Sequence, residues 1–510
     1  MKKIIISALF TLSLFATYAK GKEVLPKHEM RAAWIATVAN IDWPSRAGLS
    51  VEQQQKEMID LLDVLKETGM NTVVFQIRPA TDAMYASPYE PWSQWLNGQQ
   101  GKAPNPYYDP LEFIIDQCHK RGLEFHAWMN PYRAVFNFMS TKVSASHITK
   151  RHPEWFVNYG KHTYFNPGLQ ETRDYVASVV SDVVRRYDVD AIHFDDYFYP
   201  YKIAGEEFPD GGAFRKHPRG YPQNQKEAWR RNNVDLIIKQ LHDSIKSVKP
   251  YVKFGISPFG VWRNKDKDPE GSASKAGQTN YDDLYANILK WLNEDWIDYV
   301  TPQIYWHIGF KIADYKVLAN WWNEYTYGKN LYIGHGVYRL DKESKNPEWR
   351  SSQQLVDQVK LNRALGNVGG SMFYSAKWFR SDVLNVRETL KNNVYQQWAI
   401  VPENASIPRV EATAPQNFFI DKEGESLTFT WENEDHNTLS KPRYYILYRV
   451  RGSAKKSVRK TKNIMQVTTA DNMQFKVVKK FLSSRKRFCV TAVNRLNIES
   501  KPSNVFGIRF

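Results

Sequence analysis

Short apolar runs rich in β-branched and aromatic residues recur along the chain between about residues 30 and 395. Most of them are followed by a polar loop and then by a segment whose apolar residues repeat with the period of a helix. The eight runs cover residues 30–38, 71–78, 123–129, 190–196, 253–258, 299–306, 331–336 and 370–375. Eight strands that alternate with helices predict an α/β protein built as a (β/α)8 TIM barrel.

The helical segments carry apolar stripes and end signals. In residues 53–68, Met58, Leu61, Leu62 and Leu65 form one stripe, and Gly69 stands where a C-terminal cap is expected. Further helices are predicted over residues 110–121, 172–187, 226–248, 281–293 and 351–365. A doubly wound open sheet is the alternative. Its nucleotide-binding versions are disfavoured because no glycine-rich phosphate-binding motif opens any of these helices.

The pattern changes after Trp398. Residues 398–408 read as a linker, and short alternating runs follow at residues 427–431, 443–450, 475–478 and 487–493. Turn residues separate these runs, which is typical of a β-sandwich of immunoglobulin or fibronectin type III style. The predicted domains are therefore a barrel over residues 28–397, a linker over residues 398–408 and an all-β sandwich over residues 409–510.

The N-terminal segment has the pattern of a secretory signal peptide. Lys2 and Lys3 precede an apolar stretch over residues 4–16, and Thr17 and Ala19 are small enough for a cleavage site. We expect cleavage after Ala19 and export to the periplasm or the extracellular space, with an uncleaved anchor helix as the alternative. The segment holds no lipobox cysteine, and no later apolar run is long enough to cross a bilayer.

Composition and charge narrow the picture further. Apolar residues make up 42% of the chain and charged residues 24%, which is typical of a globular protein. The two cysteines, Cys118 and Cys489, exclude a disulfide scaffold and are expected to be free and buried. Residues 401–510 hold 20 Lys and Arg against 10 Asp and Glu, so they carry most of the formal net charge of +16. This basic region is either a solvated surface or a binding surface for an anionic cell-wall polymer. Export disfavours a nucleic-acid partner.

Candidate chemistry gathers at the strand ends. The long loops over residues 80–109, 130–170, 197–225 and 259–280 all follow strands, so in a barrel they crowd the C-terminal rim where active sites lie. Asp195 and Asp196 end the fourth strand at this rim. Adjacent carboxylates repel each other when ionised, which keeps one of them protonated as a general acid. The alternative is a capped turn, in which an aspartate binds backbone amides.

Ordinary glycoside hydrolysis uses two carboxyl groups that flank the scissile bond. Asp42, Asp82, Glu206 and Glu207 are the candidates for a partner outside the pair. If none of them is the partner, Asp195 and Asp196 are the only carboxyl groups of the site. A substrate-assisted mechanism would fit that arrangement. In that mechanism the 2-acetamido group of the substrate attacks, one aspartate orients it, and the other acts as acid and then as base.

The other polar and aromatic residues of the rim can bind hydroxyl groups and sugar rings. The candidate substrate-binding residues are Arg78, His126, Trp128, Asn130, Tyr132, Arg133, His193, Tyr199, Trp262, Gln303, Tyr305, Trp306, Tyr374 and Trp378. For each of them the alternative is a packed residue at the top of the barrel. No pair of histidines has metal-binding spacing, so neither a metal nor another cofactor is expected.

Six segments together resemble the glycosyl-hydrolase-like family ten, namely residues 31–37, 76–79, 127–133, 165–168, 192–200 and 255–260. The resemblance covers roughly residues 28–395. It implies an exported bacterial barrel, often with a fibronectin-like C-terminal domain, that acts as a glycoside hydrolase. It also favours peptidoglycan glycan strands as the polysaccharide substrate, because one member is understood to act on strands stripped of their peptides. The assignment of Asp195 and Asp196 comes from the residues alone. A non-catalytic glycan-binding barrel of the cell envelope is the alternative function.

Overall fold

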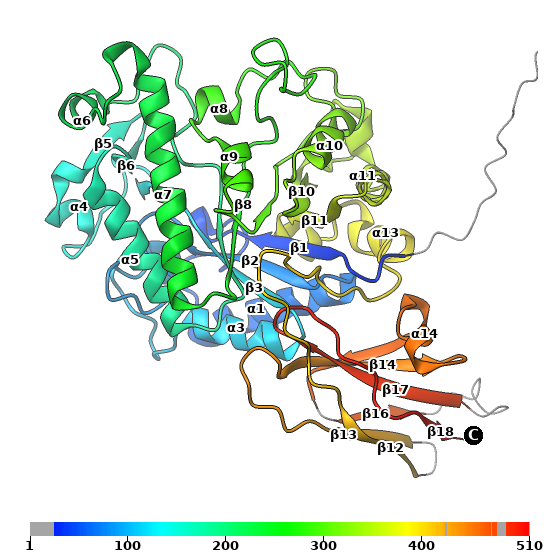
Figure 1. The fold of residues 1–510 in the computed structure, drawn as a ribbon. Coiled ribbons are helices and arrows are strands. Elements are labelled where there is room, and N and C mark those ends of the chain that lie inside the picture. Colours follow the sequence, from blue (N-terminus) through cyan, green and yellow to red (C-terminus); the bar gives the residue numbers. More distant parts are fainter. Residues whose placement is uncertain (1–24, 424–425, 471, 477–485, 509–510) are drawn as a thin grey trace, which may run out of the picture.

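The computed structural model describes residues 25–423, 426–470, 472–476 and 486–508, which form a barrel and a C-terminal all-β region (Figure 1). The predicted signal peptide, residues 1–19, lies outside the described residues. Within them, no helix combines the length and the apolar character that a bilayer crossing requires. The predicted α/β architecture is confirmed: a closed parallel barrel precedes all-β sheets.

Eight parallel strands close the barrel in the order β1-β11-β10-β9-β8-β7-β3-β2. Each of the predicted runs supplies one of them: β1 (Met30–Ile35), β2 (Thr72–Arg78), β3 (Glu124–Met129), β7 (Ala191–Phe194), β8 (Lys253–Ile256), β9 (Tyr299–Val300), β10 (Asn330–Gly336) and β11 (Val368–Tyr374). Most residues of these strands are buried because helices cover the outside of the barrel and side chains fill the inside. Gly255 leaves room for a large neighbour, since a Cβ atom there would lie 1.9 Å from the Tyr299 ring.

Helices cover the barrel in the predicted alternation: α1 (Val51–Thr68), α3 (Pro110–Lys120), α5 (Gln170–Arg186), α7 (Lys226–Val248), α9 (Ile288–Asn293), α10 (Tyr315–Glu324), α11 (Gln353–Ala364) and α13 (Val386–Asn393). Helix α1 starts with a capping box between Ser50 and Gln53 and ends at Gly69, whose φ is 99°. The single helix predicted over residues 281–293 is divided into α8 (Asn280–Asp283) and α9. Helices α10 and α13 lie outside the prediction, and the tryptophan and tyrosine residues of α10 also suit strands.

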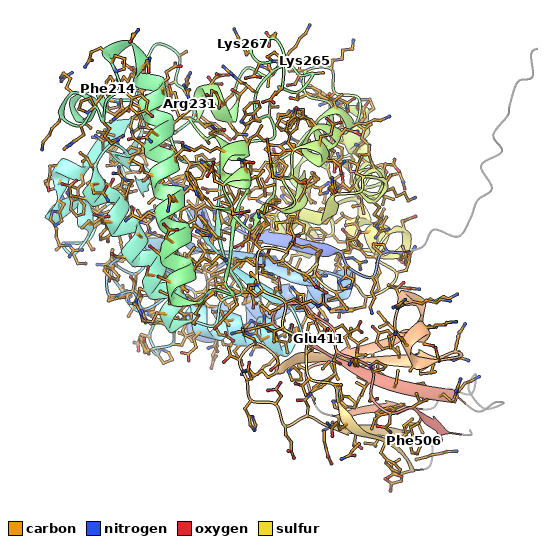
Figure 2. All side chains as sticks on the ribbon, in the orientation of Figure 1. Phe214, Arg231, Lys265, Lys267, Glu411 and Phe506 are labelled. Carbon is orange, nitrogen blue, oxygen red and sulfur yellow. The ribbon has the colours of Figure 1, made fainter. Side chains whose placement is uncertain are left out.

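The long loops of the C-terminal rim contain structure of their own. The loop after β3 folds into a small antiparallel sheet of β4 (Arg133–Val135), β6 (His162–Phe165) and β5 (Phe156–Tyr159), with the short helix α4 (Ile148–Arg151). The loops after β2 and β7 carry α2 (Gln94–Asn97) and α6 (Gly211–Lys216). Figure 2 shows Lys265 and Lys267, from the loop after β8, at the end of the molecule far from Glu411 and Phe506 of the C-terminal region.

The C-terminal region is a sandwich of two antiparallel sheets. One sheet has the order β12 (Gln416–Glu423), β13 (Ser426–Glu432), β16 (Asn472–Lys476), and the other has the order β15 (Ile464–Thr468), β14 (Pro442–Val450), β17 (Lys486–Asn494), β18 (Phe506–Ile508). Apolar side chains of both sheets form one core, in which Trp431 packs near Tyr445. Both cysteines are free and buried, as predicted. The likeness of this sandwich to a fibronectin type III domain stays a prediction.

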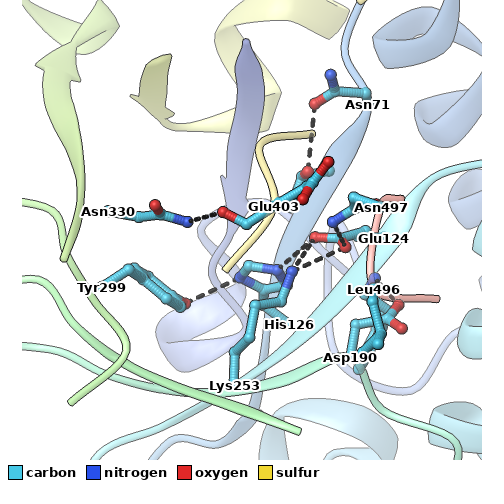
Figure 3. Close-up of polar contacts among 12 residues, drawn as sticks. Asn71, Glu124, His126, Asp190, Lys253, Tyr299, Asn330, Glu403, Leu496 and Asn497 are labelled. Atoms are coloured by element: carbon cyan, nitrogen blue, oxygen red, sulfur yellow. Dashed lines mark hydrogen bonds and ion pairs between the residues drawn. The ribbon is translucent and has the colours of Figure 1, made fainter. Parts of the chain in front are cut away.

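The sandwich lies against the N-terminal ends of the barrel strands. Arg443 pairs with the buried Asp190 just before β7, and Asn497 donates a hydrogen bond of 2.8 Å to Glu124 at the start of β3. Figure 3 shows Asn497 and Lys253 converging on Glu124. A cavity of about 550 Å³ opens beside these contacts and is lined by Lys253, residues 403–409 of the linker region and residues 495–498 of the sandwich. The opposite, C-terminal ends of the strands are left for the candidate site.

Candidate active site

A cleft of about 300 Å³ opens where the strands of the barrel end. Seven of the eight barrel strands supply its lining at or after their C-terminal ends, as expected for a catalytic site on this fold. The lining residues are Trp34, Trp128, Asp195, Asp196, Tyr197, Tyr201, Ser257, Phe259, Gln303, Tyr305, Trp306, Tyr338, Arg339 and Tyr374. Among the described residues of this lining, Asp195 and Asp196 are the only carboxylates.

Asp195 lies on the floor of the cleft and is buried. Its carboxylate accepts hydrogen bonds from the Trp128 indole at 3.1 Å and from the Asn130 amide at 3.3 Å. Burial, reinforced by the charge of Asp196, raises the pKa of Asp195 to about 7, against the lowering effect of the nearby Arg133. Asp195 can therefore hold a proton near neutral pH.

Asp196 is also buried, and burial raises the pKa of its carboxyl group. The hydrogen bonds that it accepts from the Tyr201 hydroxyl and the Gln303 amide oppose this rise. The two neighbouring carboxyl groups thus have different surroundings: indole and amide donors at Asp195, a phenol and an amide at Asp196. Different surroundings of this kind separate an acid from a base within one site.

Aromatic rings form most of the remaining wall. Tyr305 and Tyr374 stack with their ring centroids 6.0 Å apart, and Tyr338 meets both rings edge-on. Phe259 packs edge-on against Trp306, at 5.6 Å between centroids. Aromatic faces of this kind can bind the apolar faces of sugar rings.

The floor of the cleft continues into a column of buried polar residues along the barrel axis. The Tyr299 hydroxyl lies 2.9 Å from Nδ1 of His126 and 2.9 Å from Nδ1 of His193. His193 Nε2 lies 2.9 Å from the Ser257 hydroxyl, which lines the cleft. Burial lowers the pKa of both histidines, so both are neutral.

The structure brings seven of the predicted site residues into the cleft and places three directly behind it. Asp195, Asp196, Trp128, Gln303, Tyr305, Trp306 and Tyr374 form part of the lining. Asn130 contacts Asp195, Arg133 lies 5.3 Å from the Tyr197 ring, and His193 contacts Ser257. These three residues act on the cleft through the residues that line it.

Other predicted residues have partners away from the cleft. Arg78 is buried in an ion pair with Glu90, and Tyr199 donates a hydrogen bond to Asp210. Trp262 stacks on Trp321, and the Tyr132 hydroxyl is buried within the barrel domain. His126 belongs to the polar column, and Trp378 is not part of the lining. Packing within the loops turns these side chains away from the cavity.

The candidate second carboxylates also lie outside the cleft lining. Asp42 is buried and accepts hydrogen bonds from the Ala36 and Lys377 amides and the Ser375 hydroxyl, and burial raises its pKa to about 6. Burial likewise raises the pKa of Asp82 to about 7. Glu206 and Glu207 are exposed, and Glu207 pairs with Lys226.

Several lining residues were not singled out from the sequence as site residues. Tyr197 and Tyr201 belong to the aromatic run that follows the aspartate pair, and Ser257 and Phe259 end the fifth strand. Their position after a strand was the available signal, but the same signal marks many packed residues. No group of three His, Cys, Asp or Glu side chains that could hold a metal ion occurs within the described part of the chain.

Comparison with known proteins identifies the family of this chain. Residues 29–351 match the family model described as glycosyl hydrolase-like 10. The chain is 44% identical to glycosyl hydrolase YngK of Bacillus subtilis (strain 168) over 488 residues, which cover 93% of this chain and 92% of that relative. It is 37% identical to glycosyl hydrolase DigH of Escherichia coli (strain K12) over 390 residues, which cover 72% of this chain and 86% of that relative.

Among solved structures, the glycoside hydrolase domain of PgaB from Bordetella bronchiseptica is similar with a TM-score of 0.47 and 13% identity. That match covers 72% of this chain and 99% of the PgaB domain. The family model spans more than half of the chain and takes in the first seven barrel strands in sequence order, the aspartate pair and much of the aromatic wall. The chain belongs to the glycosyl hydrolase-like 10 family.

Proposed function

We propose that this protein is an exported glycoside hydrolase that cleaves O-glycosidic bonds of a polysaccharide, with peptidoglycan glycan strands as the favoured substrate. The observation that carries the proposal is the pair of adjacent buried carboxyl groups, Asp195 and Asp196, on the floor of an aromatic-lined cleft. The names of the relatives YngK and DigH support the reaction type.

The raised pKa of Asp195 supports its role as proton donor. A group with a pKa of about 7 can give a proton to the leaving oxygen and take one back from water at neutral pH. We assign Asp196 as the ionised member of the pair, because its negative charge is one of the causes that raise the pKa of Asp195. When both groups lie in one low-dielectric pocket, ionisation of Asp196 keeps the proton on Asp195.

The adjacency of the two groups supports a substrate-assisted reaction. Consecutive residues at one strand end are poorly placed to flank a glycosidic bond from both sides, and no third described carboxylate lines the cleft. We therefore assign the nucleophile to the carbonyl oxygen of a 2-acetamido group on the substrate. It bonds to the anomeric carbon while the bond to the leaving oxygen breaks and that oxygen takes the proton of Asp195. Water, deprotonated by Asp195, then opens the cyclic intermediate, and Asp196 holds the acetamido N–H throughout.

Export and attachment are part of the proposal. The N-terminal segment supports cleavage after Ala19 and release into the periplasm or the extracellular space. The basic C-terminal region offers the exposed side chains of Lys455, Lys456, Arg459 and Lys460 to an anionic cell-wall polymer. Retention of the full chain on wall material that weakens with added salt would support this attachment, and salt-independent retention would contradict it.

The test of the reaction uses the full mature chain, glycan strands stripped of peptides, and a panel of other glycans. We expect new reducing ends from the wild type and a loss of about 10²–10⁴-fold in Asp195→Asn and Asp196→Asn. Glu206→Gln is the matched control, because Glu206 is exposed on a rim loop and does not line the cleft. Folded wild-type protein that binds glycan but releases no reducing ends would instead support the glycan-binding alternative.

A second measurement separates the two roles. An aryl N-acetylglucosaminide with an acidic phenol needs little proton donation, so Asp195→Asn should keep its first bond-breaking step. Asp196→Asn should lose this first bond-breaking step, because the acetamido group of the substrate is no longer oriented. Equal losses in both variants on this substrate would contradict the division of roles while leaving the site assignment in place.

A further inference from the structure

Arg339 is the only cation among the described residues that line the cleft. It ends the short 3-10 helix Val337–Arg339, which follows directly after β10, so the barrel wall positions it. The side chain is exposed, whereas Asp195 and Asp196 on the floor are buried. The cleft therefore has two acidic groups at its base and one guanidinium group on its wall.

The guanidinium group of Arg339 has an aromatic neighbour and no acidic one. Its central carbon lies 5.0 Å from the centre of the Tyr338 ring, and its side chain is hydrogen-bonded to that of Tyr338. No ion pair joins it to a carboxylate among the described residues. Tyr338 in turn packs edge-on against Tyr305 and Tyr374, which fixes the platform beside Arg339. The aromatic platform thus orients the cation without neutralising its charge.

The other arginines near the cleft are occupied by the protein. Arg78 pairs with Glu90, and Arg133 donates hydrogen bonds to the Pro79 carbonyl. Of these three arginines, Arg339 is bonded neither to a carboxylate nor to a backbone carbonyl among the described residues. The donors that it does not share with Tyr338 are therefore open to a ligand. A guanidinium group beside a sugar-binding platform matches the geometry of a carboxylate, which it can bind through two parallel hydrogen bonds.

We propose that Arg339 forms a subsite for the carboxylate of an acidic sugar unit in the substrate. This inference rests on the proposed function. In peptidoglycan the carboxylate is that of the lactyl ether on every second sugar, which is free only when the peptide has been removed. A peptide-bearing strand carries an amide there and loses the charge that Arg339 binds. The subsite also offsets the repulsion between an acidic glycan and the ionised Asp196.

The test compares Arg339→Gln with wild type on two preparations of the same stripped glycan strands. One preparation is untreated, and in the other the carboxylates have been reduced to alcohols. We expect Arg339→Gln to lower kcat/KM about tenfold on untreated strands, mainly through KM, and to leave reduced strands unaffected. Arg339→Lys should recover part of the loss. Arg350→Gln is the control, because the Arg350 guanidinium donates to the Ser344 carbonyl outside the cleft.

Equal losses on both preparations, or no loss on either while the wild type is active, would overturn the subsite. Absence of wild-type hydrolysis on both preparations would overturn the proposed function instead. In that case, calorimetry tests separately whether Arg339 binds the carboxylate. It measures the binding of untreated and of reduced strands to the Asp195→Asn protein. Tighter binding of the untreated strands that disappears with Arg339→Gln supports it, and equal binding contradicts it.

Discussion

The Tyr299 hydroxyl lies 2.9 Å from Nδ1 of His193 in the middle of the barrel, and it makes an equally short contact with His126. The direction of each hydrogen bond in this column can be assigned by starting from Glu124, at the end away from the cleft. The carboxylate of Glu124 only accepts, so neutral His126 carries its proton on Nε2. Tyr299 then donates to His126, and His193 donates from Nδ1 to Tyr299. His193 Nε2 is left to accept from the Ser257 hydroxyl on the cleft floor.

This relationship predicts the effect of Tyr299→Phe. Loss of the hydroxyl leaves two buried imidazole nitrogens without a partner, so the free energy of unfolding should fall by about 1–3 kcal/mol. Tyr332→Phe is the control, because the Tyr332 hydroxyl accepts from Asn330, which also donates to the Glu403 carbonyl. Urea unfolding of both variants measures the difference. Equal free energies of unfolding for the two variants would show that the hydrogen bonds of Tyr299 to the two histidines do not stabilise the fold.

The contact between the domains predicts the effect of Arg443→Met. Asp190 is buried, and the charge of Arg443 holds its pKa well below the usual range against the effect of burial. Removal of the arginine leaves a buried carboxylate whose remaining side-chain partner is the imidazole of His119, and we expect a loss of about 3–5 kcal/mol at pH 7. Arg459→Met, on the exposed face of the same region, should change stability by less than about 0.5 kcal/mol.

The pH dependence of this loss has a defined sign. A carboxylate with a lowered pKa stabilises the fold above the pKa of the unfolded chain, and the contribution disappears as the pH falls through the folded value. In Arg443→Met, burial without the arginine should leave Asp190 easier to protonate than in the wild type. The difference in free energy of unfolding between the two proteins should therefore shrink as the pH falls toward the folded pKa of Asp190 in the wild type. A difference that stays constant from pH 7 to pH 3 would contradict an ionic contribution.

The raised pKa of Asp195 predicts both an activity profile and a stability effect. Activity should fall as the pH rises through about 7, because the proton donor is lost. A buried carboxyl group with a raised pKa destabilises the fold progressively from the unfolded pKa up to the folded one. Asp195→Asn should thus raise the melting temperature by a few degrees at pH 8 and by less at pH 5. The opposite order would contradict burial as the cause.

The aromatic wall predicts the effect of Trp306→Ala. Trp306 lines the cleft and is partly exposed, so its loss removes a ring surface for the sugar without emptying the core. We expect KM to rise about tenfold with a smaller change in kcat. Trp378→Ala serves as the comparison, because Trp378 is also partly buried but does not line the cleft. A similar rise of KM in both variants would contradict sugar binding at Trp306.

Much of the fold could be predicted because its signals are local. Apolar runs predicted every barrel strand, and Gly69 marked the end of α1. The position of Asp195 and Asp196 at a strand end placed them at the mouth of the barrel. The division of the helix predicted over residues 281–293 had no such signal, because its apolar spacing continues through the break.

The sequence by itself determined the alternation of strands and helices, the all-β character of the C-terminal region and the adjacency of the two aspartates. Tertiary structure decided which rim residues reach the cleft. Arg78 and Trp262 turn toward Glu90 and Trp321, whereas Arg339 faces the cavity, although all three lie at or after the C-terminal end of a strand. The physical reason is that a side chain points toward the partner that packing supplies, and those partners come from other strands and loops. Closure of the barrel brings them together.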